Sequence, residues 1–358
     1  MSHAALAAFS NNAVAAASIV YVLAFVAHLV EWVLGRSVPV AEPVRTSTEE
    51  PARASTGVPV AVGAVTEPLG RDGTVTGVLD PEQRDGDTGD RDAEAEGRAE
   101  RIERFGRIGI ALTVLAAALH LAGLVTRGLG ADPVRVPWGN MYEFSLTGTL
   151  AVAVIYLALL RRYQLRWLGP VVTGFNVVIL MLAVLVLYEP AGPLVPALHS
   201  YWLVIHVIAA IVATGAFTVG GMASLLFLVK SRAEARAAES GTPLRRGYIA
   251  RLPQAAVLDR VAYRLHAFGF PIWTFAALVA GPIWAQYAWG RYWGWDPKEV
   301  WAFITWVVYA SYLHARATAG WKGKAAAIIA LIGLATLLFN FVGINYFFGS
   351  TSQHSYAG

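Results

Sequence analysis

The sequence predicts an all-α membrane protein, a polytopic bundle of about eight transmembrane helices. Its 358 residues are 56% hydrophobic and only 15% charged, and the mean hydropathy of +0.51 is higher than soluble domains show. Because the apolar core of a bilayer is about 30 Å thick, an apolar run of roughly 20 residues can cross it as a helix. Eight such runs occur: Ala13–Leu34, Arg107–Val125, Phe144–Leu160, Leu168–Tyr188, Trp202–Val229, His266–Tyr287, Val300–Leu313 with its last turn, and Ala325–Phe348.

The first 106 residues divide into two parts. No basic segment precedes the first apolar run and no small-residue cleavage motif follows it, so we expect residues 1–34 to stay as the first transmembrane helix. Residues 35–106 are rich in Pro, Gly, Asp and Glu and poor in aromatics, which predicts a disordered, acidic, cytoplasmic loop. Residues 107–358 then form the main membrane domain.

Basic residues divide the loops between two sides. All but four of the 28 Lys and Arg follow odd-numbered runs, the exceptions being Arg127, Arg135, Arg291 and Lys298. By the positive-inside rule the basic side is cytoplasmic, so both termini are expected outside a bacterial cytoplasmic membrane. The second polar insert, Lys230–Arg264, predicts a short helix that continues the fifth run. We expect membrane lipid around the chain and no nucleic acid partner.

The absence of cysteine limits the chemistry. The chain has none, so it carries no disulfide, no thiolate metal site and no thiol redox chemistry. Any sulfur chemistry must come from a partner.

Tryptophan is concentrated in one expected outer loop, residues 288–299, and just beyond it. Four of the twelve Trp fall within Trp289–Trp301. An interfacial aromatic belt also enriches Trp, but it does not explain Gly290 and Gly294 between the rings. Glycines let a backbone approach a flat ligand and indoles supply rigid stacking faces, so this loop predicts a platform for a planar macrocycle.

The residues that follow have a structural explanation of their own. Asp296 suits a helix N-cap, Pro297 the first helical position, and Glu299 completes a capping-box pattern. Such a helix start would hold the preceding aromatic rings in a fixed pose.

The segment Trp289-Gly-Arg-Tyr-Trp293-Gly-Trp295-Asp296-Pro-Lys-Glu299 resembles the "WWD" segment of a haem-handling family. The amino-acid sequence of this segment is more similar to the CcsA/ResC type, called CcsB in some bacteria, than to CcmC or CcmF. Trp138–Glu143 and His354-Ser355-Tyr356 are also similar to that type. The resemblance extends from about Arg107 to the end of the chain.

The eight histidines are the candidate iron ligands, because His is the commonest protein ligand of haem iron. The resemblance implies that His206 and His354 are the external axial pair, and the expected topology places both on the outer side. It also implies that His314, at the inner end of the seventh run, is an inner haem ligand. The cofactor-binding candidates are His206, His354, Trp289, Trp293, Trp295, Asp296, His314 and His120.

For several other polar residues the sequence allows both a haem-related role and a structural one. His120, and with less support His28, could ligate haem or bond a neighbouring helix. His199 is expected in a loop and His266 at a membrane interface. The Trp138–Glu143 segment could line the haem chamber, or its Asn140 could only cap the third helix. Two basic residues, Arg291 and Lys298, could pair with haem propionates or with lipid phosphates.

The family resemblance implies a function. A CcsA/ResC-type subunit of a cytochrome c synthase would bind haem b at the outer face and hold its vinyl groups against the thiols of an apocytochrome c Cys-Xaa-Xaa-Cys-His segment. The implied partners are a ResB-type membrane subunit and a thioredoxin-like thiol reductant. An alternative is a haem exporter or chaperone without ligation activity, like CcmC. An electron-transfer cytochrome is disfavoured because His354 lies in a tail, and a solute permease with aromatic anchors would bind no haem.

Overall fold

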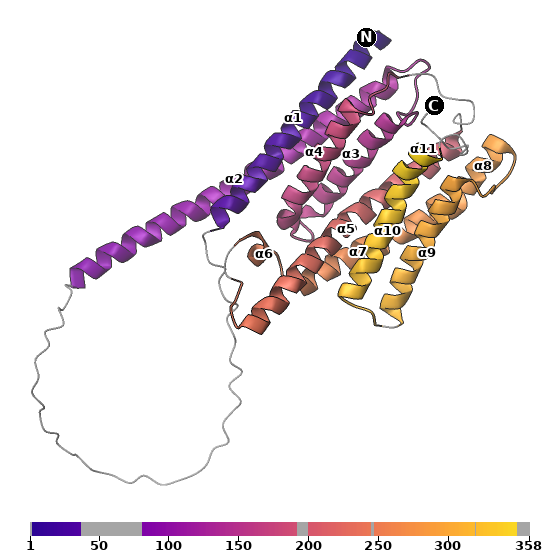
Figure 1. Ribbon diagram of the computed structural model, residues 1–358. Coiled ribbons are helices and arrows are strands. Elements are labelled where there is room, and N and C mark those ends of the chain that lie inside the picture. Colours follow the sequence, from indigo (N-terminus) through magenta and orange to yellow (C-terminus); the bar gives the residue numbers. More distant parts are fainter. Residues whose placement is uncertain (1, 37–80, 192–199, 245–246, 319, 349–358) are drawn as a thin grey trace, which may run out of the picture.

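The described part of the chain is entirely helical. The computed structural model describes residues 2–36, 81–191, 200–244, 247–318 and 320–348, and contains no strand there (Figure 1). The elements are α1 His3–Gly35, α2 Pro81–Leu129, α3 Met141–Leu160, the 3-10 turn η1 Leu165–Leu168, α4 Gly169–Leu185, α5 Tyr201–Ser240, α6 Tyr248–Arg251, α7 Ala255–Phe275, the π-helical turn η3 Ala276–Ala280, α8 Gly281–Trp289, α9 Pro297–Ala317, α10 Lys324–Leu338, the π-helical turn η4 Phe339–Gly343, and α11 Ile344–Phe347.

A helix, or a series of consecutive helical elements, covers most or all of each apolar run, so the all-α membrane fold is confirmed. Within the described residues, seven helices are long and apolar enough to cross a bilayer. The eighth, α9, is less apolar because it begins with Lys298 and Glu299 and ends near Arg316. Its 21 residues still span about 31 Å.

The helices α2 and α5 extend far into the polar segments beside their apolar runs. The helix α2 begins at Pro81, so residues 81–106, expected as part of a disordered loop, are helical; residues 37–80 lie outside the described part. The acidic and basic residues before Arg107 are compatible with helix once the apolar part of α2 anchors it. The expected extension of the fifth run is confirmed, since α5 continues to Ser240 and ends at Gly241 with a φ of 64°.

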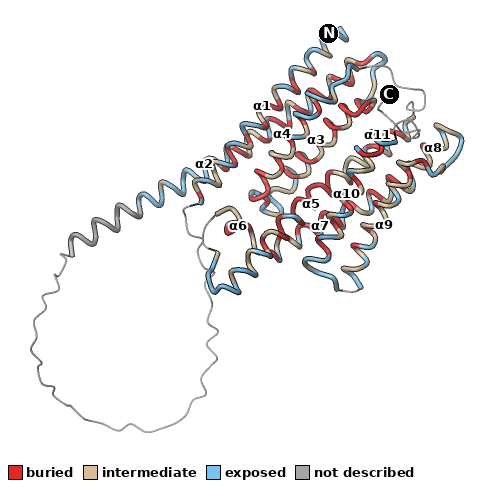
Figure 2. The backbone as a smooth tube through the Cα atoms, in the orientation of Figure 1, coloured by how far each residue is buried: buried red, intermediate tan, exposed pale blue. Residues whose placement is uncertain are grey.

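The helices form two packed groups, α1–α4 and α5–α11 (Figure 1). Tyr21, Leu146 and Leu180 are central in the first group, and Phe217, Trp273 and Tyr309 in the second. Buried residues face the interior, while exposed ones lie on the outer helix faces (Figure 2). Many of the exposed ones are large and apolar, as a lipid-facing surface requires. Examples are Ile19, Val178 and Leu185.

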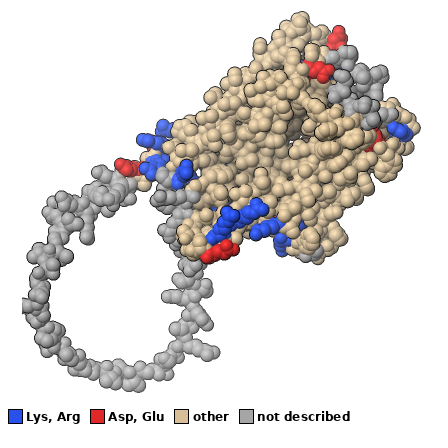
Figure 3. Space-filling model, in the orientation of Figure 1, with Lys and Arg blue, Asp and Glu red and all other residues tan. Residues whose placement is uncertain are grey.

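The two ends of the bundle differ in composition. One, called here the tryptophan end, carries Trp138, Trp202, Trp284 and Trp289, which share a cluster. The other, the basic end, carries Arg166, Lys230, Arg251 and Arg316. Figure 3 shows Lys, Arg, Asp and Glu side chains towards the ends of the visible face, with an uncharged surface between them.

Glu143 organises the tryptophan end. Its fully buried carboxylate accepts hydrogen bonds from Arg127 Nε at 2.9 Å, from Arg135 Nη1 at 2.7 Å and from the Gly139 N–H at 2.7 Å. Arg127 also donates to the Glu189 carbonyl, just beyond α4. One carboxylate therefore joins the end of α2, the 130–139 loop, the start of α3 and the segment after α4.

We expect Glu143→Gln to lower the free energy of unfolding by about 3 to 5 kcal/mol, because it leaves two buried guanidinium groups without their counter-charge. Denaturant titration in detergent measures this loss. Glu100→Gln is the matched control, because the Glu100–Arg104 pair (3.2 Å) is exposed and should change stability by less than about 1 kcal/mol. Equal effects of the two variants would contradict a structural role for the Glu143 network.

Candidate functional site: a cavity at the tryptophan end

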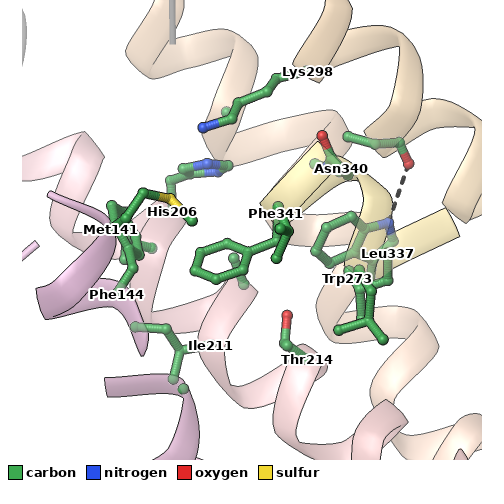
Figure 4. Close-up of a pocket in the computed structure, with 18 of the residues that line it drawn as sticks. Met141, Phe144, His206, Ile211, Thr214, Trp273, Lys298, Leu337, Asn340 and Phe341 are labelled. Atoms are coloured by element: carbon green, nitrogen blue, oxygen red, sulfur yellow. Dashed lines mark hydrogen bonds between the residues drawn. The ribbon is translucent and has the colours of Figure 1, made fainter. Parts of the chain in front are cut away.

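A cavity of about 360 Å³ lies between the two helix groups at the tryptophan end (Figure 4). Side chains from α3, α4, α5, α9 and α10 line it, together with η3, η4 and the loop before α9. Most of the lining is apolar or aromatic, and a few polar groups project into it. This volume and composition are typical of a small-molecule site.

His206 is the histidine of the cavity wall. Its Nδ1 lies 2.9 Å from the carbonyl oxygen of Ala276. A carbonyl only accepts hydrogen bonds, so Nδ1 carries the proton and the lone pair of the neutral ring lies on Nε2. Trp284 stacks on the imidazole with centroids 5.8 Å apart and planes inclined by 14°. The ring is thus held in one tautomer and one orientation.

A π-helical turn makes this contact possible. In η3 the Gly281 N–H bonds back to the Ala276 carbonyl, five residues earlier, and the same carbonyl accepts from His206. A Cβ at position 281 would lie 3.2 Å from His206 Cε1, so glycine leaves the imidazole room. The turn and the glycine together place a ring from α5 against the backbone between α7 and α8.

A second π-helical turn borders the same cavity. In η4 the Ile344 N–H bonds to the Phe339 carbonyl, and the turn contributes Asn340, Phe341 and Val342 to the lining. The Asn340 Oδ1 is buried without a hydrogen-bond partner. Such turns occur often at functional sites, because the extra residue re-aims side chains on one helix face.

The loop between α8 and α9 is fixed at both ends. Gly290 ends α8 with a φ of 71°. The predicted capping box is confirmed, since Asp296 Oδ1 accepts from Lys298 N at 3.0 Å and Glu299 Oε2 accepts from Asp296 N at 3.1 Å. The same Glu299 oxygen accepts from Gly294 N at 2.8 Å, so the helix start also holds the loop.

The tryptophans of this loop have different surroundings. Only Trp293 of the three proposed from the sequence lines the cavity, and its buried indole N–H has no hydrogen-bond partner. Trp289 packs behind Trp284 with centroids 4.8 Å apart, and Trp295 is 69% exposed. Trp284, at the start of the Trp-rich stretch, was not among the proposed site residues although it contacts His206.

The Trp138–Glu143 segment both caps a helix and contributes to the cavity wall. Asn140 caps α3 by accepting from Glu143 N at 2.9 Å. Met141, the next residue, lines the cavity, and its Sδ accepts from Asn345 Nδ2 at 2.8 Å. The segment therefore joins the start of α3 to α11 across the cavity.

Comparison with known proteins identifies the family. Residues 138–350 match the family described as cytochrome c assembly protein. The chain belongs to this family. It is similar to the cytochrome c biogenesis protein CcsA of Synechococcus sp. (strain JA-2-3B'a(2-13)), with 33% identity over 312 residues, 72% of this chain and 87% of the relative. CcsA of Guillardia theta is 34% identical over 274 residues, with the same coverage of both chains. These matches support a CcsA-type cytochrome c biogenesis protein.

A solved structure shares the fold. The cytochrome c haem lyase CcmF aligns over 95% of this chain with a TM-score of 0.57 at 15% identity, and this chain spans 47% of CcmF. Every residue that lines the cavity lies within the cytochrome c assembly match, whereas α1 and α2 precede it.

Among the described histidines of this cytochrome c assembly protein, those other than His206 do not line the cavity. His354 and His199 are outside the described residues. His120 is fully buried, edge-on to Tyr21, with centroids 6.1 Å apart. His28 is buried near the basic end, with Nδ1 3.5 Å from Glu31 Oε2. His314 is exposed on α9.

His266 was expected at a membrane interface, and that expectation is wrong. The side chain is fully buried, with Nε2 3.3 Å from Ser224 Oγ and the rings of Tyr309 and Tyr312 beside it. Because α7 begins at Ala255, residue 266 lies three turns inside the helix, not at its start. No group of three or more His, Cys, Asp or Glu among the described residues could hold a metal ion.

Proposed function

We propose that this protein binds haem b in the cavity beside His206 and presents it at the outer membrane face for covalent attachment to apocytochrome c. The observation that carries the proposal is the fixed His206 ring, whose Nε2 bears the lone pair in a largely apolar cavity. A neutral imidazole whose second nitrogen bonds a carbonyl is the usual arrangement of a histidine that ligates iron.

The lining fits a porphyrin. A macrocycle needs apolar walls and flat aromatic contacts, which Trp293, Phe144 and Phe341 supply. The carboxylates of its propionates need a cation, and Lys298 lines the cavity. The chain itself has no cysteine, so both sulfur atoms of the product come from the apocytochrome. Each thiol S–H adds across one vinyl group, and the protein contributes binding and orientation.

The second external ligand in this proposal is His354. It is the seventh residue after Phe347, where α11 ends, and a fully extended chain of that length reaches about 24 Å. Loss of one external imidazole when the apocytochrome's own His arrives is the proposed release step.

A separate inner haem would involve His314. Its side chain is exposed on α9 near the basic end, so this chain alone does not enclose it. We propose that a ResB-type membrane subunit covers this surface, which would make the inner site shared between two chains. A thioredoxin-like reductant would keep the substrate thiols reduced.

The orientation follows from charge. By the positive-inside rule, the basic end of the bundle, which carries Lys230 and Arg316, would face the cytoplasm of a bacterium. The tryptophan end would then face outward. The alternative function, export or chaperoning of haem without ligation, would use the same cavity. The two differ only in whether attachment follows binding.

Co-expression with a ResB-type subunit and an apocytochrome c tests the proposal. We expect covalent haem on the cytochrome with the unaltered chain, and at least a tenfold lower yield with His206→Ala or His354→Ala. Haem that is transferred but never attached would favour the exporter, and full yield from both variants would contradict the ligand assignment.

Glycine at position 281 provides a second test. A Cβ there would lie 3.1 Å from the Ala276 carbonyl oxygen and 3.2 Å from His206, so Gly281→Val should displace the imidazole and weaken haem affinity about tenfold. Titration followed by the Soret band of purified protein measures the affinity. Gly97→Ala is the control, because a Cβ at Gly97 meets no atom within 4 Å. Unchanged affinity in Gly281→Val would show that the position of His206 does not govern binding.

A further inference from the structure

The cavity extends far deeper than His206. Along α5 its lining runs from Leu203 to Thr218, a distance of about 22 Å along the helix axis. About 18 Å of this length lies beyond His206, on the side of the basic end. In Figure 4, His206 and Thr214 lie on opposite sides of Phe341. We call the part beyond His206 the inner compartment; its lining includes Gly148, Val152, Phe175, Ile211, Thr214 and Leu337.

The inner compartment offers few polar contacts. Its walls are largely aliphatic and aromatic side chains. Two of its hydroxyls are used within their own helices, since Thr149 Oγ1 donates to the Ser145 carbonyl at 2.7 Å and Thr218 Oγ1 donates to the Thr214 carbonyl at 2.8 Å. A buried water molecule needs two to four polar partners and would find few of them here. Such walls favour hydrocarbon as the occupant.

The cavity opens towards the bilayer between α4 and α10. Three residues that line it also lie on the surface: Leu182 of α4 is 46% exposed, Leu338 at the end of α10 is 43% exposed, and Val342 of η4 is 42% exposed. All three are apolar and belong to segments long and apolar enough to cross a membrane. An opening bordered by such side chains faces lipid, so the chains of the surrounding lipid can enter it.

Packed aromatic rings close the inner compartment towards the basic end. Trp273 lines the cavity and belongs to a buried cluster with Phe217 and Tyr309. The rings of Phe217 and Tyr309 are fully buried and stack with centroids 3.7 Å apart and planes inclined by 5°. The compartment is therefore a slot with a closed inner end, which limits the length of its occupant.

The length of the slot matches that of one lipid chain. Because the apolar core of a bilayer is about 30 Å thick, the acyl chains of one leaflet span about 15 Å. The inner compartment extends about 18 Å along α5. Left empty, it would deprive its walls of dispersion contacts on one side. A single chain in the slot would supply contacts to α3, α4, α5 and α10 at once.

We propose that the inner compartment binds one acyl chain of a membrane phospholipid, which enters between α4 and α10 from the leaflet at the tryptophan end. The bound lipid joins the helix group α1–α4 to the group α5–α11 and stays with the protein when the surrounding lipid is removed. The inference goes beyond the proposed function and does not depend on it, because it concerns the space deeper than His206.

Gly148 allows the slot to be filled from within. It lines the cavity, and a Cβ at this position would meet no atom of the described chain within 4 Å. The leucine side chain of Gly148→Leu should therefore take the space of the lipid chain. Gly148→Ala is the matched control, because it raises helix propensity in a similar way and leaves most of the slot open.

Native mass spectrometry of the full-length protein, delipidated in detergent, measures the retained lipid. We expect the unaltered protein and Gly148→Ala to retain one phospholipid per chain, and Gly148→Leu to show a lipid-bound fraction roughly tenfold smaller or less.

A second measurement uses the unaltered protein and so does not depend on the folding of a variant. The protein is equilibrated in vesicles with a phospholipid that carries a photoreactive diazirine near the end of one acyl chain, delipidated in detergent and then illuminated. Peptide mass spectrometry maps the crosslinks. We expect them at Gly148 and at Ile211 to Thr214, and not at Val178 and Leu185, which are on the outer face of α4.

An unaltered protein that retains no phospholipid would overturn the inference, as would an isoprenoid quinone retained in its place. Equal retention by Gly148→Leu and the unaltered protein would also overturn it, and so would crosslinks confined to Val178 and Leu185. Haem binding at His206 is measured separately by the Soret band, so either proposal can fail while the other survives.

Discussion

The site depends on one hydrogen bond, between the Nδ1 of His206 and the carbonyl oxygen of Ala276. A regular helix at membrane depth uses its carbonyls internally, and a histidine from a neighbouring helix would find few acceptors there. The π-helical turn Ala276–Ala280 provides one, because its carbonyl has a second lone pair directed at α5. Irregular backbone in a membrane protein is tolerated where it lines a cavity, and both π-helical turns of the described chain do so.

Rigid elements surround this bond. The capping box of Asp296 and Glu299 fixes the tryptophan loop, and Glu143 joins α2, α3 and the loop between them. In both places a buried carboxylate accepts hydrogen bonds from backbone or guanidinium donors and so holds neighbouring segments together. A binding site held in this way loses little conformational entropy when a ligand enters.

The sequence predicted the helices and the loop start well, because both depend on local patterns. Apolar runs marked every bundle helix, and Asp296-Pro297-Lys298-Glu299 predicted the capping box that the structure shows. It also directed attention to His206, which lines the cavity. The helix before Arg107 was missed, because residues 81–106 have the composition of a loop and are helical as an extension of α2.

Side-chain direction could not be read from the sequence. Neither π-helical turn has a sequence signature, so the contact between His206 and Ala276 was not foreseeable. For the same reason the surroundings of the tryptophans were not foreseeable: Trp284 stacks on His206, whereas Trp295 is exposed. The same holds for two histidines: His266 is buried and His314 is exposed, and their positions in the sequence do not indicate this difference.

Chemical rescue of His206 tests the central claim most directly. Replacing His206 by glycine removes the imidazole and leaves space for a free imidazole molecule beside Ala276. Purified with haem, His206→Gly should lose the absorption bands of low-spin, six-coordinate haem, and added imidazole should restore them. Spectra identical to those of the unaltered protein before any imidazole is added would contradict ligation of haem iron by His206.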